Sequence, residues 1–182
     1  MPAPTRITVA LDPETVRLLE EMKAESRLSQ SGLIRRALQF YAENKRLIDR
    51  HGAKRVGTYV DMLADGEHVI LDIDHFLMFL GLLESSPEKE RFWEDHRKVA
   101  AAHSEHLPQK VRSPGEFLER LEACNLFKLS RISETEYTLI LYSDLAKRFV
   151  KTLVEDVLSG MGYEVEIKED LAKLRLKVLR RS

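Results

Sequence analysis

The sequence is 182 residues long, 43% hydrophobic and 32% charged, and its formal net charge is −1. This length and apolar content suffice to bury one core of ordinary size or two small ones, and they exclude a wholly disordered chain. The near-neutral total does not by itself indicate a nucleic-acid partner. Residues 1–60, however, contain 11 Lys and Arg against 7 Asp and Glu, a net charge of +4 that leaves −5 for the remainder. An anionic partner is therefore expected at the N-terminal part.

Cys124 is the only cysteine, so one chain can form neither an internal disulfide nor a thiolate zinc cage. A reducing compartment fits this composition best. The first residues, MPAPTRITVALDPE, contain no apolar run long enough for a signal peptide, and no stretch approaches the roughly 20 apolar residues of a membrane span. We therefore expect a cytoplasmic protein with no membrane partner.

Residues 6–11, RITVAL, alternate between apolar and other side chains with the two-residue period of a half-buried strand. The two faces consist of Ile7, Val9 and Leu11 and of Arg6, Thr8 and Ala10. Asp12 and Pro13 then give the signal for a helix start, because an aspartate can cap free amides and proline suits the first helical turn. We expect a helix from there to about residue 26.

Ser29 is a second candidate helix cap, and apolar residues recur at helical spacing after it to beyond Asn44. Gly52 and Gly57 punctuate the chain next, so the sequence predicts a boundary near residues 50–57. The expected organisation is a strand-helix-helix (βαα) module over residues 1–50 and a second domain over residues 51–182.

The second domain is expected to be rich in helices at first and to end in a ββαββ unit, so that the whole chain is of the α+β class. The expected elements are helices over 54–63, 74–84, 86–107, 113–123 and 143–159, and strands over 68–72, 127–132, 137–141, 163–167 and 174–179.

A single N-terminal strand poses a physical problem, because it has no ladder partner and two helices alone bury too little apolar surface. Dimerisation would solve both. If residues 6–11 pair antiparallel with the same residues of a second chain, the apolar faces of both strands cover four helices. The outward faces then form a two-stranded ribbon, and a ribbon of this width fits the major groove of DNA.

The segments RITVALDPETVRLLEEM and RLSQSGLIRRALQFY resemble the ribbon-helix-helix family, which includes the CopG-type, Arc and MetJ repressors and the nickel-responsive regulators. The resemblance implies double-stranded DNA as a partner. It also implies that Arg6, Thr8 and Ala10 occupy the outward ribbon positions that face base edges. Ala10 departs from the polar residue usual at the third position, which leaves only an apolar contact there.

The resemblance further implies a phosphate contact at the N-terminus of the second helix, where the matching residues are Ser29, Gln30 and Ser31. Free amides and the helix dipole favour an anion at such a position. The function that follows is a sequence-specific transcriptional regulator acting as a homodimer or higher oligomer. A repressor is the expected type.

Residues 51–182 exceed what DNA binding needs, so we expect them to bind a small-molecule effector, to dock a protein or to assemble the oligomer. A metal-responsive, nickel-regulator-like sensor is an alternative, since five of the six histidines in this region lie beyond residue 60 and three of them could share one helix face. These residues are His68, His75, His96, His103 and His106. The ligand set of the nickel regulators is not reproduced, so no metal site or cofactor is expected.

An antitoxin is a further alternative, although the C-terminal part is long and patterned for folding, unlike a short toxin-binding tail. No catalytic motif is present. Asp72, Asp74 and His75 form the nearest approach to a catalytic cluster, and the two aspartates fit better as a strand end and a helix cap. We expect no enzyme activity. Cys124 is expected to be a small buried apolar residue rather than a ligand or a nucleophile.

Overall fold

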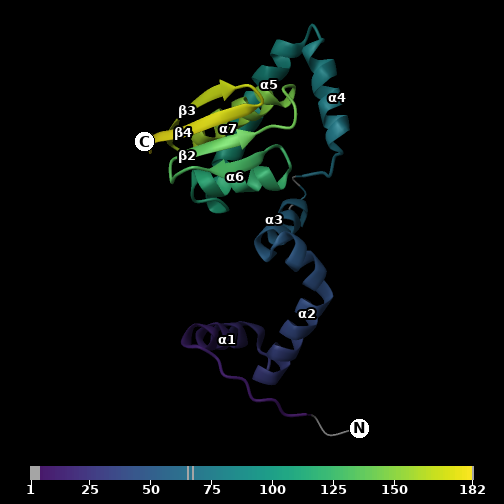
Figure 1. The fold of residues 1–182 in the computed structure, drawn as a ribbon, viewed down its shortest axis with the longest axis vertical. Coiled ribbons are helices and arrows are strands. Elements are labelled where there is room, and N and C mark those ends of the chain that lie inside the picture. The colour runs from purple at the N-terminus through teal and green to yellow at the C-terminus, as the bar shows by residue number, and fades with distance from the viewer. Residues whose placement is uncertain (1–4, 65, 67, 182) are drawn as a thin grey trace. The chain divides into compact units, whose positions relative to one another are not determined.

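The computed structural model describes residues 5–64, 66 and 68–181, and it divides the chain into two compact units, Met1–Val56 and Gly57–Ser182. Figure 1 shows the elements of both units. The first unit contains helices α1 (Pro13–Ser26) and α2 (Gln30–His51). Helix α3 (Ala53–Ala64) spans the division between the units. The fold is a mixture of helices and sheet, as the sequence predicts.

Both helices of the first unit begin at the predicted caps. The Asp12 carboxylate accepts a hydrogen bond of 2.7 Å from the Thr15 amide, and the Ser29 hydroxyl accepts one of 3.1 Å from the Gly32 amide. Helix α1 ends at Arg27, whose φ of 55° is left-handed and turns the chain toward α2. Gly52, with a φ of 78°, ends α2 in a conformation that glycine adopts without strain. Both helices of the first unit therefore end at a residue with a positive φ.

The strand predicted over residues 6–11 is absent from the single chain. Residues 5–12 are exposed and form no regular element, with Ile7 83% and Val9 67% exposed. The physical reason is that a strand is stabilised by hydrogen bonds to a neighbour, and the sheet of the described chain lies entirely in the second unit. Residues 6–11 therefore have the sequence pattern of a strand but no neighbouring strand to pair with in the single chain.

The second unit is built on a four-stranded antiparallel sheet of order β1-β2-β4-β3. Its strands are β1 (Lys128–Arg131), β2 (Glu136–Ile140), β3 (Tyr163–Asp170) and β4 (Lys173–Arg181). Helix α7 (Ala146–Gly160) connects β2 to β3, and β4 pairs between these two strands. This topology places the longest pairing, β3 with β4, at one edge.

Helices cover one face of the sheet. The remaining helical elements are α4 (Ile73–Glu84), α5 (Lys89–His106), the 3-10 turn η1 (Leu107–Gln109) and α6 (Pro114–Ala123). Helices α6 and α7 contact the strands, and α5 packs on α7 (Figure 1). Gly160 makes that packing possible, because a Cβ there would lie 2.1 Å from the Ser104 hydroxyl of α5. The close contact between α5 and α7 thus requires glycine at position 160.

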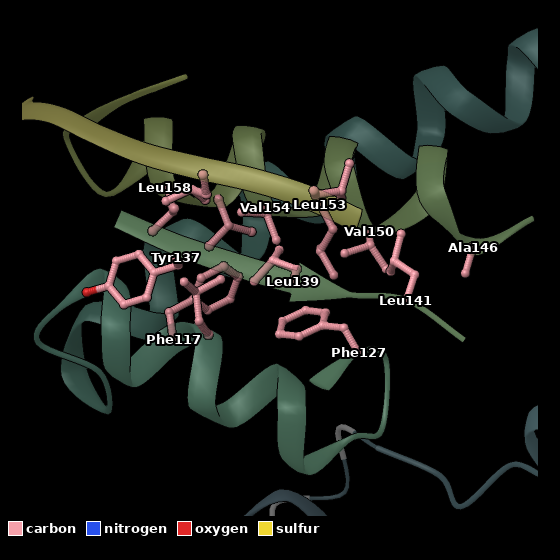
Figure 2. Close-up of a cluster of buried hydrophobic side chains, with 14 of the residues drawn as sticks. Phe117, Phe127, Tyr137, Leu139, Leu141, Ala146, Val150, Leu153, Val154 and Leu158 are labelled. Atoms are coloured by element: carbon pink, nitrogen blue, oxygen red, sulfur yellow. The ribbon is translucent and has the colours of Figure 1, made fainter. Parts of the chain in front are cut away.

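The core lies between the sheet and these helices. Alternate residues of β2 are buried, namely Tyr137 and Leu139, and Leu174 of β4 is buried beside them, as expected for a sheet with one covered face. Figure 2 shows the side chains of β2 meeting Phe117 from α6, Phe127 before β1 and a row of apolar residues from α7. Phe127 is fully buried. The other face of the sheet is charged and open.

Three expectations for the second unit need correction. Residues 68–72, predicted as a strand, form no regular element, and Val69 and Ile70 are each 86% exposed. An apolar run forms a strand only where it can pair with the edge of a sheet, and none of the described strands pairs with residues 68–72. The helix predicted from residue 86 begins at Lys89. The helix predicted from Ser143 begins at Ala146, although the Ser143 hydroxyl accepts a bond from the Leu145 amide.

Candidate nucleic-acid interface

The predicted base-reading residues Arg6, Thr8 and Ala10 all lie in the exposed N-terminal segment. They alternate with Ile7 and Val9, so an extended backbone would place the two groups on opposite sides. These residues are neighbours in the sequence, but the single chain forms no strand that would place them on one face. A ribbon face would require the same segment of a second chain beside them.

The predicted phosphate-binding residues Ser29, Gln30 and Ser31 lie at the exposed start of α2. Ser29 is the cap, and its carbonyl also accepts a bond of 2.8 Å from the Leu33 amide. The first amides of a helix have no acceptor within it, so those of Gln30 and Ser31 are oriented for an external acceptor. A Cβ on Gly32 would lie 3.1 Å from the capping hydroxyl, so glycine keeps this turn uncrowded.

Arg35 is a cationic residue at the same helix end that the sequence reasoning missed. Its Nε donates a hydrogen bond of 3.2 Å to the Ser31 carbonyl, which holds the exposed guanidinium one turn after the cap. The signal was available, since an arginine four residues after Ser31 lies on the same helix face. The sequence-based prediction considered only the free amides of the helix start and so did not include Arg35.

The cationic side chains of α1, unlike the guanidinium at the start of α2, are paired with carboxylates of their own helix. Arg17 pairs with Glu21 at 3.8 Å and Lys23 with Glu20 at 2.9 Å, so the cations of α1 are largely balanced along its surface. At the beginning of α1, the hydrogen bond from the Thr15 amide lowers the pKa of Asp12. An ionised Asp12 suits its helix and disfavours a phosphate. The start of α2 has a neutral cap, Ser29, so no carboxylate of the cap would oppose an anion there.

The first unit leaves most of its apolar surface uncovered. Among its described residues only Leu33 is buried. Exposed apolar side chains line both helices, and the largest exposed fractions are those of Leu18 (54%), Leu38 (64%) and Phe40 (61%). Apolar surface of this extent marks an interaction site, because a folded unit otherwise covers such side chains.

The histidines considered for metal binding have different surroundings in the structure. His96 packs against α7, with Nε2 3.3 Å from the Phe149 carbonyl oxygen, and burial lowers its pKa. His103 and His106 line a cavity with His68. Within residues 5–64, 66 and 68–181, no three His, Cys, Asp or Glu side chains form a group that could hold a metal ion.

The remaining candidates of the second unit have local structural roles. Asp72 caps α4 by accepting a bond of 2.9 Å from the Asp74 amide, and His75 lies 3.7 Å from its carboxylate on the surface. Cys124, expected to be buried, is instead exposed, because it follows the end of α6; its sulfur still lies 3.4 Å from that of Met62, and partial burial of the thiol raises its pKa. Of the helices in the described ranges, none is both long and apolar enough to cross a membrane.

Comparison with known families adds to this geometry. Residues 5–45 match the family model described as "Ribbon-helix-helix protein, copG family". No curated protein matches the chain. Proteins of the ribbon-helix-helix family bind DNA as dimers, in agreement with an unpaired N-terminal segment and two helices without a core of their own. Residues 5–45 of this chain are therefore similar to the ribbon-helix-helix proteins of the CopG family.

Proposed function

We propose that the chain is a transcriptional regulator that binds specific double-stranded DNA sites as a homodimer or higher homo-oligomer. The observation that carries the proposal is the family match over residues 5–45. It falls on a segment whose alternating side chains are exposed and unpaired in the single chain.

In the proposed dimer, residues 6–11 of two chains pair antiparallel. Ile7, Val9 and Leu11 face inward, where they cover the exposed apolar faces of α1 and α2. Pairing also satisfies the backbone amides and carbonyls of the extended segment. The same step therefore builds the ribbon and supplies the core that the first unit lacks.

Base reading falls mainly on Arg6 and Thr8. The guanidinium of Arg6 can donate two hydrogen bonds to guanine O6 and N7, which is worth roughly 1–3 kcal/mol of discrimination against other bases. Ala10 offers only an apolar contact, for example to a thymine methyl group. Two side chains per strand therefore carry most of the specificity.

Affinity without sequence preference would come from the start of α2. The amides of Gln30 and Ser31 and the hydroxyl of Ser29 surround the positive end of the helix dipole, where a phosphate binds well. Arg35 adds a positive charge beside them. These contacts fix the ribbon in the groove.

The second unit would supply a noncatalytic function, either effector binding or assembly. A core of its own, with Phe127 and Leu139 fully buried, favours a regulator over an antitoxin with a short toxin-binding tail.

The test is selection of bound DNA from a random pool with the full chain, followed by gel-shift titration of the enriched site. We expect a palindromic site with a defined half-site spacing, because a two-fold dimer reads two half-sites. Arg6→Ala removes this contact from both chains of the dimer, roughly 2–6 kcal/mol in total, so it should weaken binding to that site about 30-fold or more, while Arg97→Ala, at an exposed residue of α5, should not. Failure to enrich any sequence, or unchanged affinity of an intact Arg6→Ala dimer, would overturn the proposal.

A further inference from the structure

The second unit contains a cavity of about 530 Å³ between helices α3 to α7. Cavities of roughly 300–1,000 Å³ are typical of small-molecule sites. All residues that line it belong to the unit Gly57–Ser182. It is therefore a feature of one folded unit and does not involve the DNA-binding segment.

The walls of the cavity are apolar and firmly packed. Phe76 and Phe149 meet edge to face with ring centroids 5.2 Å apart, and Phe117 and Val157 are 2% and 0% exposed members of the main core. Leu153, also in the core (Figure 2), completes this wall. Because these side chains are held by the core, the cavity keeps its shape without a ligand, which lowers the entropic cost of binding.

The polar part of the lining is basic. It consists of His68, His103, His106, Lys110 and Arg120, and no Asp or Glu is among the described residues of the lining. Helical spacing explains this grouping: His103 and His106 lie three residues apart on α5, and Phe117 and Arg120 lie three apart on α6. Helix α5 thus presents two basic side chains on one face, and α6 presents a basic side chain next to an apolar one.

Two of these basic groups are held in place. Asp61 of α3 pairs with the Arg120 guanidinium at 2.9 Å, and the Arg120 side chain is only 13% exposed. The Nδ1 of His106 lies 3.0 Å from the Ala102 carbonyl oxygen, a distance at which a protonated Nδ1 donates and directs Nε2 away from the helix backbone. A preorganised, partly desolvated cation binds an anion more strongly than a solvated one does.

We propose that this cavity binds a small organic anion, a monocarboxylic acid with an apolar body. The body would replace water against Phe76, Phe149 and Val157, and the carboxylate would accept hydrogen bonds from Arg120 and from the histidines. A neutral ligand of the same shape would lose the second contribution, and a cation would be repelled. The proposal goes beyond DNA binding and does not depend on it.

The test is calorimetric titration of the full-length protein with octanoate, 1-octanol and octylamine, which share one apolar body and differ in the polar group. Benzoate and decanoate extend the series to an aromatic and a longer body. A charge-assisted hydrogen bond contributes about 1.5–3 kcal/mol, so we expect octanoate to bind roughly 10- to 100-fold more tightly than 1-octanol. The amine should not bind measurably.

Two neighbouring alanines of α5 provide a matched pair of variants. Ala102 lines the cavity and Ala101 does not, and both are exposed. Ala102→Phe should fill the cavity and abolish carboxylate binding, whereas Ala101→Phe should leave the Kd unchanged. Arg120→Gln should weaken binding roughly tenfold or more. Should that variant fail to fold, Lys110→Gln replaces it, with Lys98→Gln, outside the cavity, as its control.

Circular dichroism establishes that each variant is folded before titration. The proposal is overturned if no carboxylate of the series binds, if the alcohol binds as tightly as the acid, or if Ala102→Phe binds like the wild-type chain. Because DNA is absent from every arm, these outcomes are distinct from a failure of the DNA-binding role.

Discussion

Replacing Val9 with alanine is expected to weaken dimerisation about 30-fold. Val9 is 67% exposed in the single chain, and the proposed pairing would cover that fraction. The substitution removes two methyl groups, each worth about 0.8 kcal/mol when fully buried, so one chain loses about 1 kcal/mol and a symmetric dimer about 2 kcal/mol. At about 1.4 kcal/mol per tenfold change, the dimer Kd rises by a factor of about 30.

Sedimentation equilibrium over a range of protein concentrations measures this Kd. Thr8→Ala is the matched control, because it also exchanges a β-branched residue for alanine and lowers strand propensity by a similar amount. Thr8 belongs to the opposite face, however, and should lose no buried area. Equal weakening of the dimer by both substitutions, or none by Val9→Ala, would refute the assignment of the inward face.

Further expectations concern packing, acid stability and the anion site. Gly160→Ala should lower the free energy of unfolding of the second unit by about 1–3 kcal/mol in urea. Adding Ser104→Gly to this variant should restore most of the loss, since the Cα of residue 104 would lie 4.0 Å from the new Cβ. If the losses of the two substitutions simply add in the double variant, the proposed clash is wrong. Burial lowers the pKa of His96 below 6.5, so the unfolded chain binds the proton more readily and stability falls as the pH drops below about 6.5. In thermal melts from about pH 7 to about pH 5, His96→Phe should flatten that fall, and an unchanged slope would exclude His96 as its source. Ser29→Asp should retain the helix cap and the wild-type stability, yet bind DNA more weakly, because its charge repels a phosphate. Ser29→Ala should lower the free energy of unfolding by about 1 kcal/mol, because it removes the cap. Tighter DNA binding by Ser29→Asp would argue against a phosphate at this helix start.

The starts of α1, α2 and α6 were predictable from the sequence because their causes are local, whereas those of α5 and α7 lie three residues after the predicted ones. Asp12, Ser29 and Ser113 each accept a bond from an amide three residues later, so four residues of sequence contain the whole signal. The alternation of residues 6–11 is a local pattern too, but the two faces that it defines stay a prediction, because the single chain forms no strand there. Which of these side chains touch DNA stays a prediction.

Features that depend on distant residues were not predictable in this way. The run HVILD has the composition of a strand, but whether it joins a sheet depends on an edge elsewhere in the fold, and it stays exposed. The central place of β4 between β2 and β3 likewise follows from packing of the whole unit. The cavity brings His68 near Phe149 although they lie far apart in the sequence, so no local pattern could indicate it.

The unpaired state of residues 5–12 has a consequence for how the proposed regulator would respond to its own abundance. If the DNA-reading surface forms only when two chains meet, its amount below the dimer Kd rises with the square of the chain concentration. Halving the supply of chains would then reduce the active species about fourfold, by mass action. Synthesis and degradation of the chain would therefore set occupancy of the DNA sharply, even with no ligand bound.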